Sequence, residues 1–308
     1  MTVAPEDDAD GDRRERTPAA DDGGVRLTWL GHSSVVIELA GVRLLTDPLL
    51  RRRTGPLVRS DPAPDRRHWH DPDAVLLSHL HHDHADLASL RRLGGAPVLS
   101  GLGNRDWLAN RGLTVAGQVD RPDPSDAGGG SMADDDAWWT VPDPRPAQPE
   151  GRPGLSRGAV SVRLVKAVHE SRRMPHRPND THGFLVRSTE LVVYFAGDTA
   201  LYDEMADLAE LAGRAIDVAV LPIGGWGPVL SNGHLGPATA AEAAARIGAR
   251  AVLPVHYGTL HLWGWPRPFL GWKHAPLASF IRDVREAAPG ARLCATALGE
   301  TTTVFPQS

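Results

Sequence analysis

The 308-residue chain has almost none of the residues that build disulfide frameworks, and no long apolar run. Its single cysteine, Cys294, excludes an intrachain disulfide and a cysteine-rich structural zinc site. A lone thiol fits a reducing compartment, so we expect a cytoplasmic protein. No stretch approaches the roughly 18 apolar residues of a membrane span, and the first residues lack the apolar segment of a signal peptide.

An excess of basic residues is also missing. Lys and Arg total 33 against 38 Asp and Glu, which gives a net charge of −5. Bulk attraction to phosphate backbones is therefore not expected, and nucleic acid is not a predicted partner. The chain does have 41% hydrophobic residues, enough for a substantial core. Its length allows one large domain or two small ones, and no feature fixes the oligomeric state.

Two segments differ from the rest in composition. Residues 1–24 are polar and charged, which predicts a disordered tail before a folded domain over residues 25–308. Residues 118–158 are rich in Pro, Gly and Asp and predict a loop insertion. This insertion is either a flexible surface excursion or a lid beside the substrate, and Trp138 and Trp139 could anchor it.

The hydrophobic pattern predicts strands first, then strands alternating with helices, and this order is repeated. Alternating or buried apolar runs at 25–31 and 34–48 indicate two or three strands, with Ala40-Gly41 as a hairpin turn. Similar runs indicate strands at 73–78, 97–101, 159–170, 182–188, 190–199, 216–225, 251–258 and 292–305. Helical periodicity covers 85–95, 104–112, 201–213, 237–249 and 278–290. The order predicts an α/β fold with two packed sheets and helices outside them, a four-layer αββα sandwich.

The segment "SHLHHDHADL", residues 78–87, concentrates four histidines and two aspartates. It follows directly on the buried strand predicted at 73–78. His79, His81 and Asp83 alternate, so an extended backbone would point all three to one side. His84 needs a turn to reach the same centre. This spacing indicates a metal site rather than a solvated loop.

Three further polar residues, His169, Asp198 and His256, each follow an apolar run where a strand should end. A buried polar group without a partner costs several kcal/mol, so these placements require partners. The candidate metal ligands are therefore His79, His81, Asp83, His84, His169, Asp198 and His256. Five imidazoles and two carboxylates exceed the need of one tetrahedral zinc and suit two metals that share a bridging carboxylate.

The motif "HLHHDH", followed in order by a lone His, the Asp of "AGDT" and a late His, resembles the metallo-β-lactamase superfamily. Within it, "LTWLGHSSVVIEL", "LLTDP", "YFAGDT" and "NGHLGPATA" are similar to the branch that contains N-acylphosphatidylethanolamine-hydrolysing phospholipase D and ascorbate-6-phosphate lactonase. The resemblance covers residues 25–305 and implies the metallo-β-lactamase fold.

The resemblance also implies how the seven residues are shared between two divalent metal ions. His79, His81 and His169 would hold one ion, Asp83, His84 and His256 the other, and Asp198 would bridge them. Zinc is the expected metal, and Mn or Fe suits the same ligands. The members that cleave β-lactams commonly use a cysteine ligand and lack the bridging Asp. Since Cys294 lies in a predicted terminal strand, antibiotic hydrolysis is not expected.

Four other residues have an open role. His234 matches a histidine near the substrate in the phospholipase branch, which implies a catalytic or substrate-contacting role, although it could also cap the following helix. His32 could orient a site group or be structural. Asp47 could hold the second ring nitrogen of a ligand or shape a turn. His82 should face away from the metals. Histidines in polar surroundings are not expected to be ligands: His68, His70, His176, His182, His261 and His274.

These features predict a dinuclear metal-dependent hydrolase in which a metal-bridging hydroxide attacks phosphorus or a carbonyl carbon. Asp198 and His234 are the predicted catalytic residues. Two divalent cations, two carboxylates and one hydroxide leave a charge of about +1, which favours an anionic small-molecule or lipid-like substrate. A phosphodiester is the first choice, and the alternatives are a phosphorylated or other small lactone and a nuclease of the same superfamily. An iron redox enzyme would need a flavin domain, and an inactive regulator would not need seven intact ligands.

Overall fold

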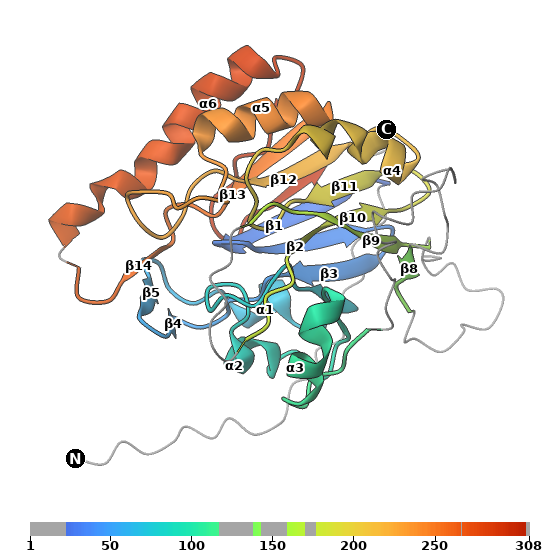
Figure 1. The fold of residues 1–308 in the computed structure, drawn as a ribbon, viewed down its shortest axis with the longest axis vertical. Helices are drawn as coiled ribbons and strands as arrows, with labels where there is room; N and C mark the ends of the chain where they lie inside the picture. The colour runs from blue at the N-terminus through green and yellow to red at the C-terminus, as the bar shows by residue number, and fades with distance from the viewer. Residues whose placement is uncertain (1–22, 117–137, 143–158, 170–176, 266, 306–308) are drawn as a thin grey trace.

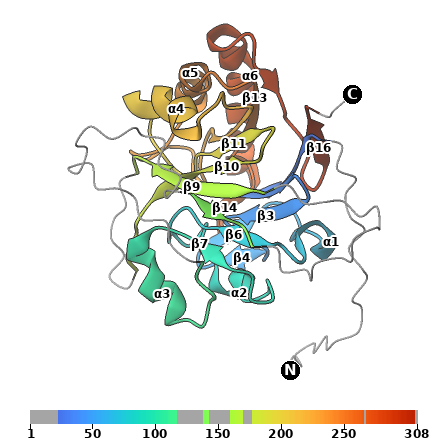
Figure 2. The same cartoon turned by 90° about the vertical axis from the view of Figure 1, so that its right-hand side faces the viewer.

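The computed structural model describes residues 23–116, 138–142, 159–169, 177–265 and 267–305. The tail predicted at 1–24 and most of the insertion predicted at 118–158 lie outside these residues. The described part forms two main β-sheets packed face to face, with helices on both outer sides (Figures 1 and 2). None of its helices is both long and apolar enough to cross a membrane.

The first sheet has six strands in the order β16-β1-β2-β3-β6-β7. Its strands are β1 (Val25–Gly31), β2 (Ser34–Leu39), β3 (Val42–Thr46), β6 (Ala74–Leu76), β7 (Val98–Leu99) and β16 (Thr301–Val304). β1, β2 and β3 pair antiparallel, and β3, β6 and β7 pair parallel. Ala40 and Gly41 both have positive φ angles, 47° and 75°, as a tight turn between β2 and β3 requires.

The second sheet has seven strands in the order β15-β13-β12-β11-β10-β9-β8. Its strands are β8 (Trp139–Thr140), β9 (Ser161–Lys166), β10 (His182–Arg187), β11 (Val192–Phe195), β12 (Val218–Pro222), β13 (Ala251–Val255) and β15 (Arg292–Leu293). β11, β12, β13 and β15 pair parallel, so their carboxyl ends meet at one edge. Polar residues that follow these strands are brought together there.

The main hydrophobic core lies between the two sheets. Strands β11, β12 and β13 are buried at every position, as expected for strands covered on both faces. The helices α4 (Leu208–Ala212), α5 (Pro237–Ile247) and α6 (Ala275–Ala287) cover the outer face of the seven-stranded sheet (Figure 1). The short helices α1 (Arg66–Trp69), α2 (Leu87–Leu90) and α3 (Arg105–Ala109) lie outside the six-stranded sheet. The predicted four-layer αββα sandwich is confirmed.

Some features differ from the predicted elements or add to them. The strand expected over 292–305 is two strands, because the chain crosses between the sheets after β15 and turns at Gly299, where φ is 78°. A third, small sheet joins β4 (Arg53–Thr54), β5 (Leu57–Arg59) and β14 (Leu260–Leu262). Within the insertion, β8 pairs with β9, and Trp138 and Trp139 pack against the main core. This part of the insertion is therefore anchored on the sheet. The structure also adds 3-10 turns over Leu102–Asn104, Asp203–Asp207 and Arg267–His274.

Candidate metal centre

The seven predicted ligands lie at the same edge of the two sheets. The segment from His79 to His84 follows β6, His169 follows β9, Asp198 follows β11 and His256 follows β13. The residues His79, His84, Asp198 and His256 are each at most 1% exposed. Polar groups buried this deeply require partners, and they find them in one another.

Three imidazoles form a first cluster. Nδ1 of His81 lies 2.9 Å from Nε2 of His79 and 3.1 Å from Nε2 of His169. Nitrogens that share a tetrahedral metal at about 2.0–2.1 Å lie roughly 3.3 Å apart, so the three atoms are spaced for one ion. The sequence predicted these three residues as one group, and the structure brings them together.

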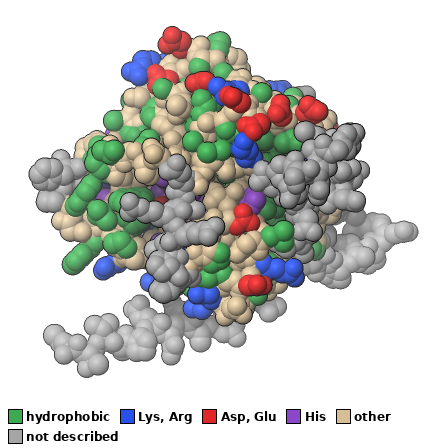
Figure 3. Space-filling view, viewed as in Figure 1, with side chains coloured by type: hydrophobic (Ala, Val, Ile, Leu, Met, Phe, Trp, Pro, Cys, Tyr) green, Lys and Arg blue, Asp and Glu red, His purple; other side chains and the backbone are tan. Residues whose placement is uncertain are grey.

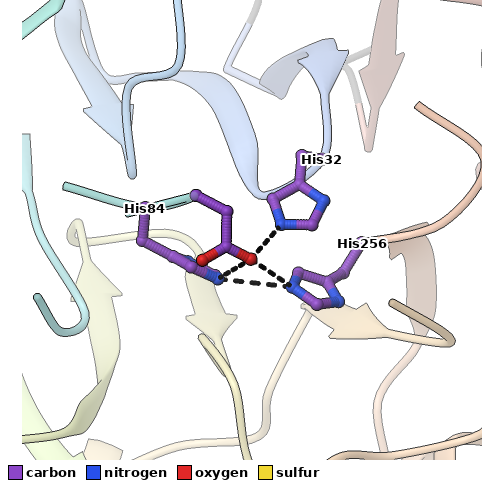
Figure 4. Close-up of side chains that lie close together, drawn as sticks. His32, His84 and His256 are labelled. Carbon is purple, nitrogen blue, oxygen red and sulfur yellow. Dashed lines mark hydrogen bonds and ion pairs between the residues drawn. The ribbon is translucent and has the colours of Figure 1, made fainter. Parts of the chain in front are cut away.

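A second cluster contains Asp83, His84 and His256, joined by His32. Nε2 of His84 lies 3.3 Å from Nε2 of His256. Oδ2 of Asp83 lies 3.7 Å from the first of these nitrogens and 3.9 Å from the second. Figure 4 shows the rings of His32, His84 and His256 turned toward one carboxylate.

Asp198 lies between the two clusters. Its Oδ1 is 3.1 Å from Nε2 of His256, and its Oδ2 is 3.1 Å from Nε2 of His84. Nε2 of His79, in the first cluster, lies 3.9 Å from Oδ2. The buried Oδ1 accepts no hydrogen bond. A buried carboxylate oxygen without a hydrogen bond, facing histidine nitrogens, fits a cation better than a purely structural role.

Backbone carbonyls and one aspartate hold the outer ring nitrogens. Nδ1 of His169 lies 2.9 Å from the carbonyl oxygen of Gly233, and Nδ1 of His256 lies 2.8 Å from that of Gly224. Nδ1 of His84 lies 2.7 Å from Oδ2 of Asp47. Each contact leaves the proton on the outer nitrogen and the lone pair on the inner one, which is the arrangement that metal-bound histidines use.

Asp47 supports both clusters. It accepts hydrogen bonds from the backbone N–H of Ser78 at 2.7 Å and from the Ser78 hydroxyl at 2.6 Å. Since that hydroxyl donates to Asp47, it accepts from Nδ1 of His79, 2.9 Å away. One carboxylate therefore orients His84 directly and His79 through Ser78. The sequence left the role of Asp47 open and gave no sign of the Ser78 link.

The protonation states suit metal binding. Burial lowers the pKa of His79 and of His256 well below the usual value, so both rings are neutral. Burial alone would raise the pKa of Asp198 and of Asp83, but the neighbouring histidines lower both well below the usual range. Burial opposes the charge of His84, but three surrounding aspartates raise its pKa. A divalent ion bound at the inner nitrogen of His84 would take the place of the proton that these carboxylates favour.

Residues 42–257 match the Beta-lactamase superfamily domain. The chain belongs to the metallo-β-lactamase superfamily. A UPF0173 metal-dependent hydrolase of Exiguobacterium sp. is 30% identical over 240 residues, which cover 76% of this chain and 87% of that relative. Igni18, a metallo hydrolase of the archaeon Ignicoccus hospitalis, shares the fold with a TM-score of 0.61 and 24% identity, over 91% of this chain and 98% of Igni18. The predicted superfamily and fold are confirmed.

A more distant relative is N-acyl-phosphatidylethanolamine-hydrolyzing phospholipase D 1 of Caenorhabditis elegans. It is 27% identical over 252 residues, which cover 77% of this chain and 64% of that relative. With the family match and the named hydrolases, the predicted enzyme class is confirmed: the chain is a metal-dependent hydrolase.

The two ligand clusters and Asp198 border a cavity of about 760 Å³. Its polar lining includes His81, Asp83, His169, Asp198 and His234. Four apolar lining residues, which we call the apolar wall, come from distant parts of the chain: Pro56, Leu57, Trp226 and Leu262. Figure 3 shows hydrophobic side chains gathered on one side of the molecule, over β14. The sequence gave no sign of this apolar wall, because the small sheet that supplies Leu57 and Leu262 was not predicted.

His234 lies at the edge of the centre. Its Nε2 is 3.2 Å from Oδ2 of Asp198, and its Nδ1 is 3.2 Å from the carbonyl oxygen of Ser231. Burial lowers the pKa of His234, but the hydrogen bond and charge of Asp198 raise it, and the net shift is upward. The first residue of α5 is Pro237, and the cap position before it is Gly236, so His234 does not cap the helix.

The other histidines that the structure describes belong to neither cluster. His82 lines the cavity but belongs to none of the metal-like groups among the described residues. The same holds for His68, His70, His182, His261 and His274. His182 differs from its expected polar setting, because it is buried in β10 and its Nε2 lies 2.9 Å from Oδ1 of Asp180. His176 lies outside the described residues.

Proposed function

We propose that this protein is a two-metal phosphodiesterase that cleaves an anionic phosphodiester with an apolar, lipid-like group. The position of Asp198 carries the proposal. Its carboxylate lies between a cluster of three imidazoles and a cluster of one carboxylate and two imidazoles. A carboxylate shared by two ligand groups suits a bridge between two divalent ions. The imidazole-rich donors favour zinc, with Mn or Fe as alternatives.

Two bound cations would supply a hydroxide nucleophile near neutral pH and offset charge in the transition state. The side chains of the chain position these parts. Asp198 holds the two ligand groups at a fixed separation and is available to take the proton of the attacking water. His234, on the cavity side of Asp198, is available to donate a proton to the leaving oxygen.

The charge of the centre needs one correction. Asp47, which touches the outer nitrogen of His84, adds a negative charge that the sequence count omitted. The sum falls from about +1 to about 0. Asp47 lies behind His84 and does not line the cavity, so a substrate still meets the metal side of the centre. The expected preference for an anionic substrate therefore rests on the positive charge that the metals would present to the cavity, and not on the total charge of the centre.

The apolar wall favours a phosphodiester over a phosphorylated lactone. A phosphodiester carries its charge on the oxygens of the reacting phosphoryl group, where bound metals would offset it. A phosphorylated lactone reacts at its carbonyl carbon and must place a second charged group elsewhere. None of the described residues that line the cavity is Lys or Arg, whereas Leu57, Trp226 and Leu262 offer apolar contact. The same composition disfavours a polyanionic nucleic acid.

Substrate class is tested by steady-state kinetics on a panel. It contains bis(p-nitrophenyl) phosphate, alkyl p-nitrophenyl phosphates, phosphorylated and neutral lactones, a β-lactam and single-stranded DNA. We expect kcat/KM for the phosphodiesters to exceed that for every other class by about 100-fold or more, equal to about 2.7 kcal/mol. A lactone or a β-lactam as the preferred substrate would contradict the proposal.

The zinc-reloaded protein is expected to hold two ions per chain, because seven ligands exceed one ion's need. Replacing His169 or His256 by alanine should each reduce the content to about one ion, since each variant removes a ligand from a different cluster. Elemental analysis of the three proteins measures this. The exposed His274→Ala variant is the control and should keep two ions. A maximum of one ion in the reloaded wild type would refute the dinuclear centre.

The apolar wall predicts a dependence on chain length. Burial of each methylene is worth about 0.8 kcal/mol, so kcat/KM for alkyl p-nitrophenyl phosphates should rise up to about fourfold per methylene until the wall is covered. Leu262→Ala and Trp226→Ala should raise KM for an octyl substrate by about five- to tenfold and leave the methyl substrate nearly unchanged.

Val229→Ala is the matched control, because Val229 is 83% exposed and does not line the cavity. Equal losses on octyl and methyl substrates in the Leu262 and Trp226 variants would show that the wall does not select the alkyl group.

A further inference from the structure

We infer that His32 is a positioning residue of the second cluster: it holds Asp83 in the orientation that the metal requires and supports the ring of His256. The inference rests on the proposed two-metal function. It concerns the ligands themselves, however, so metal binding can test it without any substrate.

The backbone of His32 is strained and held in place. His32 follows Gly31 in the turn between β1 and β2 and has a φ of 52°, a conformation that costs a non-glycine residue about 1–3 kcal/mol. Its N–H donates to Oγ1 of Thr259 at 2.8 Å. Its carbonyl accepts from Nε1 of Trp29 at 2.9 Å and from the N–H of His256 at 3.0 Å. The turn is therefore tied directly to the ligand His256.

Among the described residues, the side chain of His32 has one polar contact, and it is with Asp83. Nε2 of His32 lies 2.9 Å from Oδ2 of Asp83. Because an ionised carboxylate only accepts, Nε2 carries the proton. Nδ1 is buried and has no hydrogen-bond partner. The ring packs against that of His256, with 3.9 Å between centroids and 35° between planes (Figure 4).

The contact selects the orientation of Asp83. The oxygen that accepts from His32 is the same one that lies 3.7 Å from Nε2 of His84 and 3.9 Å from Nε2 of His256. A carboxylate oxygen has two lone pairs, so one can accept from His32 while the other faces the cluster. Without the N–H of His32, no hydrogen bond holds Oδ2 of Asp83. The side chain of Asp83 could then rotate and turn this oxygen away from His84 and His256.

A purely structural histidine would behave differently. Its loss would lower the stability of the metal-free protein and leave metal affinity unchanged in the folded fraction. A positioning histidine acts on one metal site through one N–H, so a side chain that restores the N–H should restore the site. Glutamine places its amide nitrogen near the position of Nε2, and phenylalanine keeps the ring without a donor.

The test measures Co²⁺ affinity by chelator competition in a His169→Ala background, which weakens the first cluster. His32→Phe should weaken binding by about 10- to 100-fold and shift the Co²⁺ visible absorption bands, because contacts around metal ligands typically have effects of this size. His32→Gln should stay within about fivefold of His32. The exposed His274→Phe variant is the control for a histidine-to-phenylalanine change.

Three results would overturn the inference. These are unchanged affinity in folded His32→Phe, equal losses in the Phe and Gln variants, and complete loss of Co²⁺ from a folded Phe variant, which would make His32 a ligand. If His32→Phe does not fold, His32→Asn replaces it. Asparagine tolerates positive φ and its amide is too short to reach Asp83. A wild type that binds two ions but cleaves no phosphodiester would refute the proposed substrate and leave the role of His32 standing.

Discussion

Replacing Asp198 by asparagine is expected to lower kcat/KM by at least about 10³-fold, equal to about 4 kcal/mol of transition-state stabilisation. The amide has no negative charge and offers one acceptor oxygen, whereas the carboxylate faces His84 with one oxygen and His256 with the other. An amide N–H₂ group on either side would point a donor at a cation. The variant should therefore also retain fewer metal ions after reloading and dialysis.

Two control variants make this result specific. Asp217 is another buried aspartate, directly before β12, where it accepts from the N–H of Val192 at 2.8 Å and from Arg250 at 2.7 Å. Asp217→Asn should lower the melting temperature and keep the metal content. His82→Ala changes a cavity histidine outside both clusters and should cost at most a few-fold. Similar losses in Asp198→Asn and His82→Ala would show that the ligand assignment is wrong.

The clusters could be predicted from the sequence because burial leaves a clear pattern around them. A strand such as β13 is apolar at each of its five positions, and a histidine directly after it is unexpected unless it has a partner. The same holds for Asp198 after β11 and His79 after β6. The signal is local, because each residue and its strand are adjacent in the chain. Only the meeting of the strand ends is non-local: parallel pairing brings together the ends of β11 and β13, and the packing of the two sheets brings the end of β6 to them.

The apolar wall could not be predicted for the opposite reason. Leu57 and Leu262 meet because β5 and β14 pair in a three-residue register. Strands this short have no detectable periodicity, and their pairing depends on loops that the main sheets hold in place. Ser78 shows a related limit: its hydroxyl links His79 to Asp47, and only coordinates reveal the direction of that bond.

The end of the chain shows how tertiary contacts override a local pattern. Residues 292–305 read as one strand, yet β15 pairs with β13 and β16 pairs with β1 in the other sheet. The N–H of Gly299 donates to the carbonyl of Trp29 at 2.8 Å, which fixes the crossing. One segment of the chain therefore supplies an edge strand to each sheet: β15 to the second and β16 to the first. It also supports β1, the strand that leads into the turn at His32.

Replacing His234 by alanine is expected to slow turnover without emptying the metal centre, and the size of the effect should depend on the leaving group. General acid catalysis contributes about 10²–10⁴-fold where the leaving group needs a proton. For a dialkyl phosphodiester, whose alkoxide leaves poorly, we therefore expect a loss of about 10²–10³-fold. For a p-nitrophenyl ester, whose leaving group is stable as an anion, the loss should stay below about tenfold.

This difference separates the roles that the geometry allows His234. Its Nε2 faces both Asp198 and the cavity, so it could protonate the leaving oxygen, bind the phosphate charge or hold metal. Equal losses on both substrates, mainly in KM, would make it a charge-binding residue. Loss of an ion from the variant, measured by elemental analysis, would make it a ligand. A leaving-group dependence with full metal content is the outcome expected of a general acid, because only a proton donor distinguishes the two leaving oxygens.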